Sequence, residues 1–138
     1  MKLIGFLSAL IGLVLMGSAS ADEFPSMVGA WEGTSEAVVL GDARYYGDTS
    51  NSAIPRLSSA AFTLDITHQE GRLFWGTLTS SRITEAWIGT FWNDGTSFHG
   101  VGSRGQVFGR IIDGNAIEMI YTQTGNTLIT SHVVFLRQ

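Results

Sequence analysis

Downstream of Pro25, apolar and polar residues alternate in short segments that end in turn residues. A period of two is typical of β-strands that bury one face. No stretch of ten residues in this region has the apolar spacing of an amphipathic helix. The pattern therefore predicts eight strands, at residues 27–40, 60–68, 72–80, 83–92, 96–101, 106–112, 116–123 and 128–137.

Short turn sequences separate the later strands. Each puts glycine or asparagine where a tight hairpin needs a positive φ. They are 69–71, 93–95, 113–115 and 124–126, with a slightly longer turn at 102–105. Because hairpins join neighbours in sequence, we expect an antiparallel up-and-down meander. Eight such strands would leave aggregation-prone edges unless the sheet closes, so the sequence predicts an all-β, eight-stranded antiparallel up-and-down barrel.

An aromatic residue is followed two positions later by glycine in four predicted strands, at Trp31, Phe74, Trp87 and Phe98. Residues two apart on a strand point to the same side. Each of these strands therefore presents a large ring and a gap on one face, and we expect a ring from one strand to fill the gap on its neighbour. The alternative is that these glycines mark β-bulges.

The connection at residues 41–57 breaks the regular spacing of the turns. It is long, and it carries Tyr45 and Tyr46. Connections of this length without secondary structure are usually functional or mobile. We expect this one to lie over one mouth of the barrel.

The N-terminus has the features of a secretory signal peptide in the usual order. Lys2 precedes an apolar run at 3–16, and Ala19-Ser20-Ala21 forms an A-x-A cleavage site. The run is shorter than the roughly twenty residues that span a bilayer, although an uncleaved anchor is the alternative. We expect residues 1–21 to be a helical signal peptide, cleaved after Ala21, and residues 22–138 to be a single barrel domain. No cysteine stands at the cleavage point, so a lipid anchor is excluded.

The composition limits which binding partners and which cellular compartment we expect for this protein. Lys2 is the only lysine, so the mature domain has seven arginines against twelve carboxylates, a net charge of −5. An acidic surface without basic clusters argues against nucleic acid, and against membranes once the signal peptide is removed. The chain has no cysteine, so an exported domain of this size would depend on its apolar core. We expect a periplasmic or secreted bacterial protein.

The first predicted strand resembles a known family of barrels. Its sequence at 28–34, VGAWEGT, contains the Gly-x-Trp opening of the calycin group, which includes avidin-like and lipocalin-like barrels. In that group the tryptophan closes one end of the barrel, and an arginine near the C-terminus packs on it. The resemblance implies these structural roles for Trp31 and Arg137.

A closer likeness covers nearly the whole mature chain. Residues 64–78, LDITHQEGRLFWGTL, are similar to the hairpin L-x-I-x-x-Q-x-G-R-x-F-x-G-x-L of small exported prokaryotic calycin-like barrels of unknown function. The strand at 117–121 and the terminal Leu136-Arg137 fit the same pattern. The likeness implies the fold and no chemistry. The polar set of the avidin biotin site has no residue-by-residue counterpart in this chain.

The candidate catalytic groups do not form a recognisable set. His68, His99 and His132 fall on different strands without a partner at metal-ligand spacing, so we expect no metal. There is no Gly-x-Ser-x-Gly elbow, no glycine-rich phosphate loop and no converging pair of carboxylates. Glu85 shares the parity of Trp87 and is the one acid that we expect to face the interior, near a mouth. We expect neither an enzyme nor a cofactor.

The favoured hypothesis is a non-enzymatic barrel that binds a small apolar or aromatic ligand at the mouth beneath residues 41–57. Its predicted ligand-binding residues are Tyr45, Tyr46, Phe62, Phe74, Trp87, Phe98, Met119 and Tyr121.

The alternative is a protein-binding module. One form resembles the periplasmic protease inhibitors, small barrels that insert an N-terminal segment, here residues 22–26, into an enzyme cleft. The other form is a barrel that self-associates through Trp75, which parity places outside. An enzyme is the last hypothesis, because it would rest on the fold alone.

Overall fold

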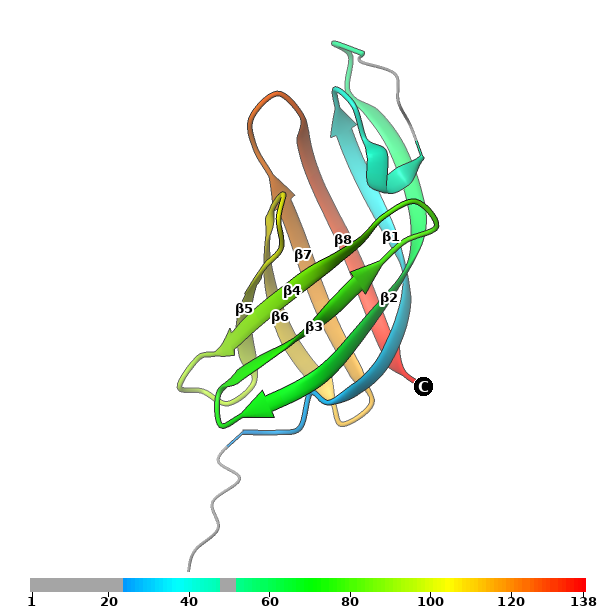
Figure 1. Ribbon diagram of the computed structural model, residues 1–138. Coiled ribbons are helices and arrows are strands. Elements are labelled where there is room, and N and C mark those ends of the chain that lie inside the picture. Colours follow the sequence, from blue (N-terminus) through cyan, green and yellow to red (C-terminus); the bar gives the residue numbers. More distant parts are fainter. Residues whose placement is uncertain (1–23, 48–51) are drawn as a thin grey trace, which may run out of the picture.

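The computed structural model describes residues 24–47 and 52–138. The predicted signal peptide and its cleavage site after Ala21 lie outside the described residues. The described chain forms eight strands and one short 3₁₀ helix (Figure 1). They are β1 (Gly29–Leu40), η1 (Arg44–Tyr46), β2 (Arg56–Glu70), β3 (Leu73–Thr79), β4 (Thr84–Phe91), β5 (Ser97–Val101), β6 (Gln106–Asp113), β7 (Ala116–Gln123) and β8 (Leu128–Arg137).

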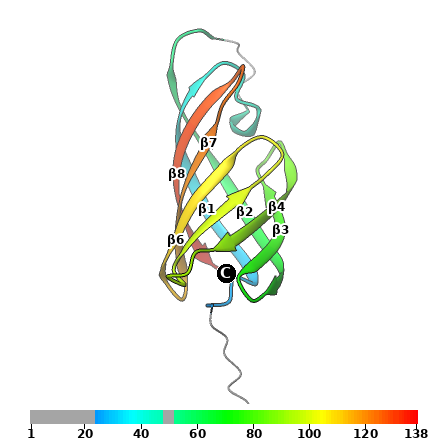
Figure 2. The ribbon, with the colours of Figure 1, turned by 90° about the vertical axis from the view of Figure 1, so that its left-hand side faces the viewer.

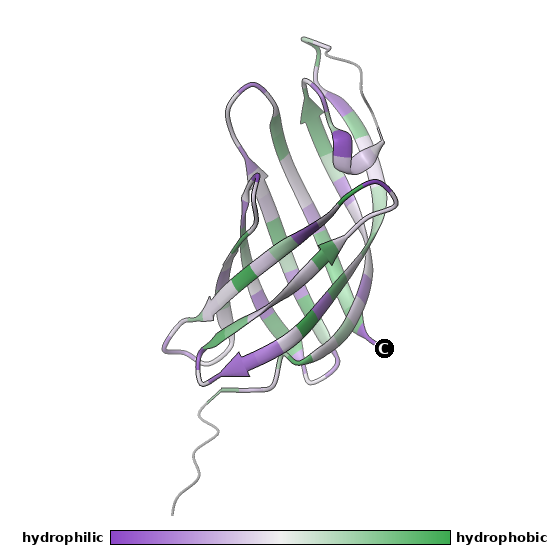
Figure 3. Ribbon diagram, in the orientation of Figure 1, coloured by the Kyte–Doolittle hydropathy of each residue, from purple (hydrophilic) through white to green (hydrophobic). Residues whose placement is uncertain are grey.

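The strands form a closed antiparallel barrel, which confirms the predicted fold class. Each strand pairs with the next along the chain, and β8 pairs with β1 to close the sheet. The residues preceding β1 lie at one end of the barrel and η1 lies at the other (Figures 1 and 2). We call these the plugged end and the mouth. Apolar and polar residues alternate along the strands in Figure 3, as a barrel with a dry interior requires.

The two strands next to the long connection differ from the prediction. β2 begins at Arg56 rather than at residue 60, because the backbone of residues 56–59 pairs with the end of β1. Leu57 is 85% exposed, so side-chain alternation gave no signal for this extension. The connection therefore spans 41–55 rather than 41–57; its η1 lies at the mouth, and residues 48–51 lie outside the described residues. β1 begins at Gly29 rather than at residue 27, because the Met27 amide donates to the Gln69 side chain, at 2.6 Å, and the pairing with β2 begins at Gly29.

Aromatic rings fill the half of the barrel next to the plugged end. The ring centroids of Phe74 and Trp87 lie 5.8 Å apart, and Phe98 packs edge-on against both. Each ring occupies a glycine gap on the next strand. A Cβ on Gly89 would lie 2.4 Å from Phe74, and one on Gly100 would lie 2.1 Å from Trp87. This arrangement confirms that rings fill neighbouring gaps.

The bulge alternative holds for one glycine. The pairing of β2 with β3 shifts register between Ile66 and His68, and Gly76 pairs with Ile66 at that point. A Cβ on Gly76 would lie 1.8 Å from the Asp65 carbonyl oxygen, so any side chain would separate the two strands. The glycines of this repeat therefore have two structural explanations: some leave room for a neighbouring ring, and Gly76 allows close approach of two strands at a bulge.

The N-terminal segment closes the plugged end. Phe24 is 8% exposed and stacks on Phe91, with a centroid distance of 5.6 Å. The guanidinium of Arg137 lies 4.0 Å from the ring centroid of the buried Trp31, the geometry of a cation–π contact. It also donates hydrogen bonds to the carbonyl oxygens of Val28, at 2.7 Å, and of Ser26, at 2.8 Å. Arg137 thus joins the last strand to the N-terminal segment.

Candidate functional site

A cavity of about 30 Å³ lies beneath η1 at the mouth of the barrel. Its walls come from six of the strands and from η1, and they are mainly aromatic and aliphatic. They are formed by Ser35, Tyr45, Tyr46, Phe62, Leu78, Val107, Met119, Tyr121, Ser131, Val133 and Phe135. By the usual measure of about 10–15 Å³ per molecule, this volume holds about two waters.

The roof of the cavity is built by η1. Its single turn is held by hydrogen bonds from the Tyr46 amide to the Ala43 carbonyl and from the Gly47 amide to the Arg44 carbonyl. It ends at Gly47, whose φ of 70° favours glycine. Consecutive residues of so tight a turn point in different directions, but the turn lies so close to the barrel that both tyrosine rings reach the cavity.

The two roof tyrosines are held mainly by ring contacts. Tyr45 is 4% exposed and packs against Phe62 and Tyr121, with centroid distances of 6.2 and 6.1 Å. Tyr46 meets Phe62 edge-on at 5.9 Å, and its hydroxyl shares a hydrogen bond of 3.0 Å with that of Ser35. These contacts are local to the mouth, and none involves the aromatic cluster of the other half.

The eight ligand-binding residues predicted from the sequence separate into two groups. Five of them line the cavity: Tyr45, Tyr46, Phe62, Met119 and Tyr121. The other three, Phe74, Trp87 and Phe98, do not line it, because they pack against one another and against Phe91 in the plugged half. All eight face the interior, but parity carries no information about height along the barrel axis.

The prediction missed six residues of the cavity wall. Ser35 and Ser131 are small polar residues at inward positions of β1 and β8, and the alternation of those strands could have identified them. Leu78, Val107, Val133 and Phe135 also face inward. Only the register between distant strands brings these side chains to the same height as the tyrosines.

A buried carboxylate stands beside the roof. Glu85 faces the interior, as its parity predicted, and is 9% exposed. Its Oε2 atom accepts hydrogen bonds from the Ser103 hydroxyl and from the Ser103 amide, the latter at 3.2 Å. Its Oε1 atom packs against Gly102, where a Cβ would lie only 2.5 Å away. Among the described residues, Oε1 and the Tyr45 hydroxyl have no hydrogen-bond partner other than each other, an acceptor that faces a donor.

The electrostatics of the mouth keep its phenols neutral. Burial, and then the neighbouring Glu85 carboxylate, raise the pKa of Tyr45 well above its usual range. Burial and the same carboxylate also raise the pKa of Tyr121, whose hydroxyl donates to Gln123 at 2.8 Å. The guanidinium of Arg104 lies 5.8 Å from the Tyr45 ring centroid. Both tyrosines therefore present hydroxyl groups rather than phenolates at neutral pH.

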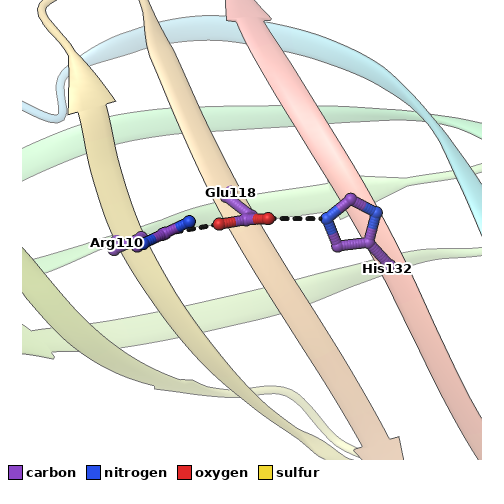
Figure 4. A network of polar contacts seen from close by, with 3 residues as sticks. All are labelled: Arg110, Glu118 and His132. Atoms are coloured by element: carbon purple, nitrogen blue, oxygen red, sulfur yellow. Dashed lines mark hydrogen bonds and ion pairs between the residues drawn. The ribbon is translucent and has the colours of Figure 1, made fainter.

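The histidines lie on the outer surface of the barrel, away from the cavity. His68 stacks on Trp75 at 5.1 Å, and His99 contacts Gln106. His132 pairs with Glu118 at 2.8 Å, and Glu118 also binds Arg110 at 2.5 Å, across three adjacent strands (Figure 4). In the part of the chain that the structure describes, no three histidines, cysteines or acids are grouped as metal ligands.

The outer face of β3, β4 and β5 carries an apolar surface. Trp75 is 41% exposed, which confirms its outward position, and the exposed Trp92 lies at the end of β4. Trp75 pairs with Ile88, and Ile88 pairs with Val101, so the three side chains lie in one row. We call Leu73, Trp75, Ile88 and Val101 the outer apolar face.

The described part of the N-terminal segment is docked on the barrel. Phe24 packs on Phe91 beneath Arg72, and the Gln69 amide donates to the Pro25 carbonyl at 3.1 Å. Asp22 and Glu23, the rest of the predicted inhibitory segment, lie outside the described residues. An inhibitor that inserts residues 22–26 into an enzyme would first have to detach Phe24. Among the described elements, no helix has the length and apolarity to span a membrane.

Comparisons with known proteins establish no family. No family model matches the chain, and no curated protein matches it. Among solved structures, the chain is similar to the S-type phycobiliprotein lyase CPES from Guillardia theta, with 16% sequence identity and a TM-score of 0.33. The match covers 81% of this chain and 88% of that one. A likeness this distant carries no argument about function. The functional proposal therefore rests on the cavity.

Proposed function

We propose that this barrel binds a small ligand with an apolar or aromatic body in the cavity beneath Tyr45 and Tyr46, and that it catalyses no reaction. The observation that carries the proposal is the contrast between the two ends. Rings and the Phe24 segment fill one end, whereas the other encloses a cavity under two tyrosines. The residues that line the closed cavity include no histidine, cysteine or acid, and the one buried acid nearby, Glu85, has no histidine or second acid paired with it among the described residues, which supports binding rather than catalysis.

Binding requires the roof to move. Ligand pockets usually measure about 300–1,000 Å³, and this cavity measures about 30 Å³. The turn that carries Tyr45 and Tyr46 is the element whose displacement would enlarge it with least damage to the sheet. The Ser35–Tyr46 hydrogen bond is worth about 0.5–1.5 kcal/mol, and the ring contacts of each tyrosine add about 0.5–1.5 kcal/mol. An aromatic ligand would replace these ring contacts and cover apolar surface that the buried Tyr45 leaves, which offsets the cost of opening.

The test is a fluorescence titration with N-phenyl-1-naphthylamine, a probe that emits in apolar surroundings. Ser131→Met fills the cavity from β8, while Thr130→Met adds the same side chain to the outer face one residue away. We expect Ser131→Met to weaken binding about tenfold or more, and Thr130→Met to leave it unchanged. Equal affinities for both variants would refute the proposal, because the probe would then sit on the outer surface.

Self-association through the outer apolar face is a second candidate, favoured by the row Trp75, Ile88 and Val101. The four residues of this face are uncharged. Two copies of a molecule with net charge −5 could therefore meet there without opposing carboxylates. Sedimentation velocity of Ile88→Ser against the unmodified protein tests this candidate. A monomer for both proteins at 100 µM would exclude it.

We also propose export to the bacterial periplasm or medium, with cleavage after Ala21. The proposal is supported by Phe24, which lies two residues after the first mature residue and is buried against the barrel. Mass spectrometry of the protein from its host envelope would give the mass of residues 22–138. The mass of the full chain would contradict the proposal.

A further inference from the structure

A buried donor and a buried acceptor face each other at the mouth. They are the Tyr45 hydroxyl and the Glu85 carboxylate, on residues that are 4% and 9% exposed, and the turn at 102–105 lies against both. Among the described residues, Glu85 Oε1 has no other hydrogen-bond partner, so it loses its donor when the roof opens and Tyr45 leaves. A buried acceptor without a donor is costly, and a ligand group that supplies the missing donor is therefore favoured.

The Glu85 carboxylate is held in a fixed orientation. Both hydrogen-bond donors of Ser103 bind Oε2, so Oε1 is the acceptor that remains available. Gly102 allows this arrangement, because a Cβ there would lie 2.5 Å from Oε1. The turn between β5 and β6 is thus built around one carboxylate oxygen and leaves the other to the Tyr45 hydroxyl.

The surroundings of Glu85 decide which ligand group fits. Oε1 needs a donor, which excludes ketones, ethers and carboxylates. The guanidinium of Arg104 over the Tyr45 ring, and that of Arg82 beside Gly47, place positive charge around the mouth and disfavour a ligand cation. A neutral hydroxyl satisfies both conditions, since it donates to Oε1 and carries no charge.

We propose that the ligand is an alcohol or phenol, whose apolar body fills the cavity and whose hydroxyl donates to Glu85 Oε1. This inference rests on the proposed function and specifies its ligand class. The hydroxyl of the ligand takes the position beside the carboxylate that the Tyr45 hydroxyl holds when the roof is closed. Tyr45 therefore acts as an internal substitute for the ligand, and Glu85 recognises both.

The test compares two ligands of the same shape. 2-Naphthol carries a hydroxyl where 2-methylnaphthalene carries a methyl group, and each displaces N-phenyl-1-naphthylamine in a competition titration. We expect the unmodified protein to prefer 2-naphthol about tenfold or more, because the methyl compound would leave Oε1 buried and unpaired. Glu85→Met should abolish this preference. Glu36→Met, a matched change on the outer face of β1, should retain it.

Gly102→Ala provides a second variant that keeps the acid. The new methyl group displaces Oε1 without removing it, so the preference for 2-naphthol should fall while circular dichroism still reports a folded barrel. This variant keeps the proposal testable if Glu85→Met fails to fold.

The other outcomes are distinct. Equal affinity for the two ligands would overturn the hydroxyl assignment and leave the binding function standing. Tighter binding of 2-naphthoate would overturn it as well, by assigning recognition to the arginines. A hydroxyl preference that persists in Glu85→Met would show that another group binds the ligand hydroxyl. Failure of all three ligands and of the fluorescent probe would overturn the proposed function and the inference together.

Discussion

Gly100→Ala tests whether the glycine gaps hold the barrel together. The new Cβ would lie 2.1 Å from Trp87 Cζ2, 2.7 Å from Cε2 and 2.8 Å from Cη2. Carbon atoms pack at about 3.5–4.0 Å, so the overlap exceeds 1 Å, and it falls on a rigid ring. Phe74 and Phe98 pack on the same indole, at 5.8 and 6.4 Å, and restrict its retreat.

The magnitude follows from two opposing effects. Overpacking of this kind costs about 1–3 kcal/mol and occasionally more. Replacing glycine by alanine also makes the unfolded chain less flexible, which offsets about 0.4–1 kcal/mol. We expect a net loss of about 2 kcal/mol, or a fall in Tm of about 10 °C. Gly114→Ala is the matched control, because a Cβ there meets nothing within 4 Å.

Urea unfolding followed by tryptophan fluorescence measures both variants. If Gly100→Ala and Gly114→Ala agree within about 0.5 kcal/mol, a margin typical of surface substitutions, the reasoning about ring-filled gaps is wrong. The double variant Gly100→Ala with Trp87→Leu gives a stricter check. Removing the ring should make the added methyl harmless, so the two changes should be strongly non-additive.

Three further predictions concern the plugged end and the outer surface. Arg137→Met should lower the free energy of unfolding in urea by about 2–3 kcal/mol, because it removes the contact with Trp31 and the hydrogen bonds to two N-terminal carbonyls. A loss below about 0.5 kcal/mol would contradict this role. Phe24→Ala should cost about 3 kcal/mol and speed proteolysis of the N-terminal segment, whereas unchanged protection would mean that its packing is not needed. The hydrogen bonds with His132 and then with Arg110 lower the pKa of Glu118 below its ordinary value of 4.5. Their stabilisation is therefore present above pH 4.5 and is lost as the pH falls through the lowered pKa. The difference in urea midpoint between Glu118→Gln and the unmodified protein should shrink from pH 7 to pH 3, and a constant difference would refute this.

The sequence could predict which side of the barrel wall a residue occupies. Alternation correctly placed Phe74 inside, Trp75 outside and Glu85 inside, because the pleat of a strand imposes a strict period of two. The turn glycines separated the strands, and most boundaries fell within one residue of the structure. The pairing of rings with glycine gaps could also be predicted, since both residue types recur at the same spacing in several strands.

Height along the barrel axis could not be predicted in the same way. Phe62 lines the cavity and Phe74 does not, although both face inward on adjacent strands. The difference comes from strand tilt and from the register of pairs such as Phe74 with Gly89, which no local pattern encodes. The start of β2 escaped prediction for a related reason. Residues 56–59 pair with β1 through their backbone, but apolar and polar residues do not alternate in this part of the sequence.

Mutations at the two ends of the barrel should have different effects. Glycine gaps and rings in the plugged half contribute stability, so Gly100→Ala should unfold the protein more easily without changing ligand affinity. Glu85→Met should do the reverse, because it no longer buries a carboxylate, which offsets the loss of the two hydrogen bonds from Ser103 and of the contact with the Tyr45 hydroxyl. Its free energy of unfolding should therefore change by less than about 1 kcal/mol while its preference for a hydroxyl disappears. A loss above about 3 kcal/mol in urea unfolding would identify Glu85 as a structural residue, whose carboxylate holds the Ser103 turn rather than recognising a ligand.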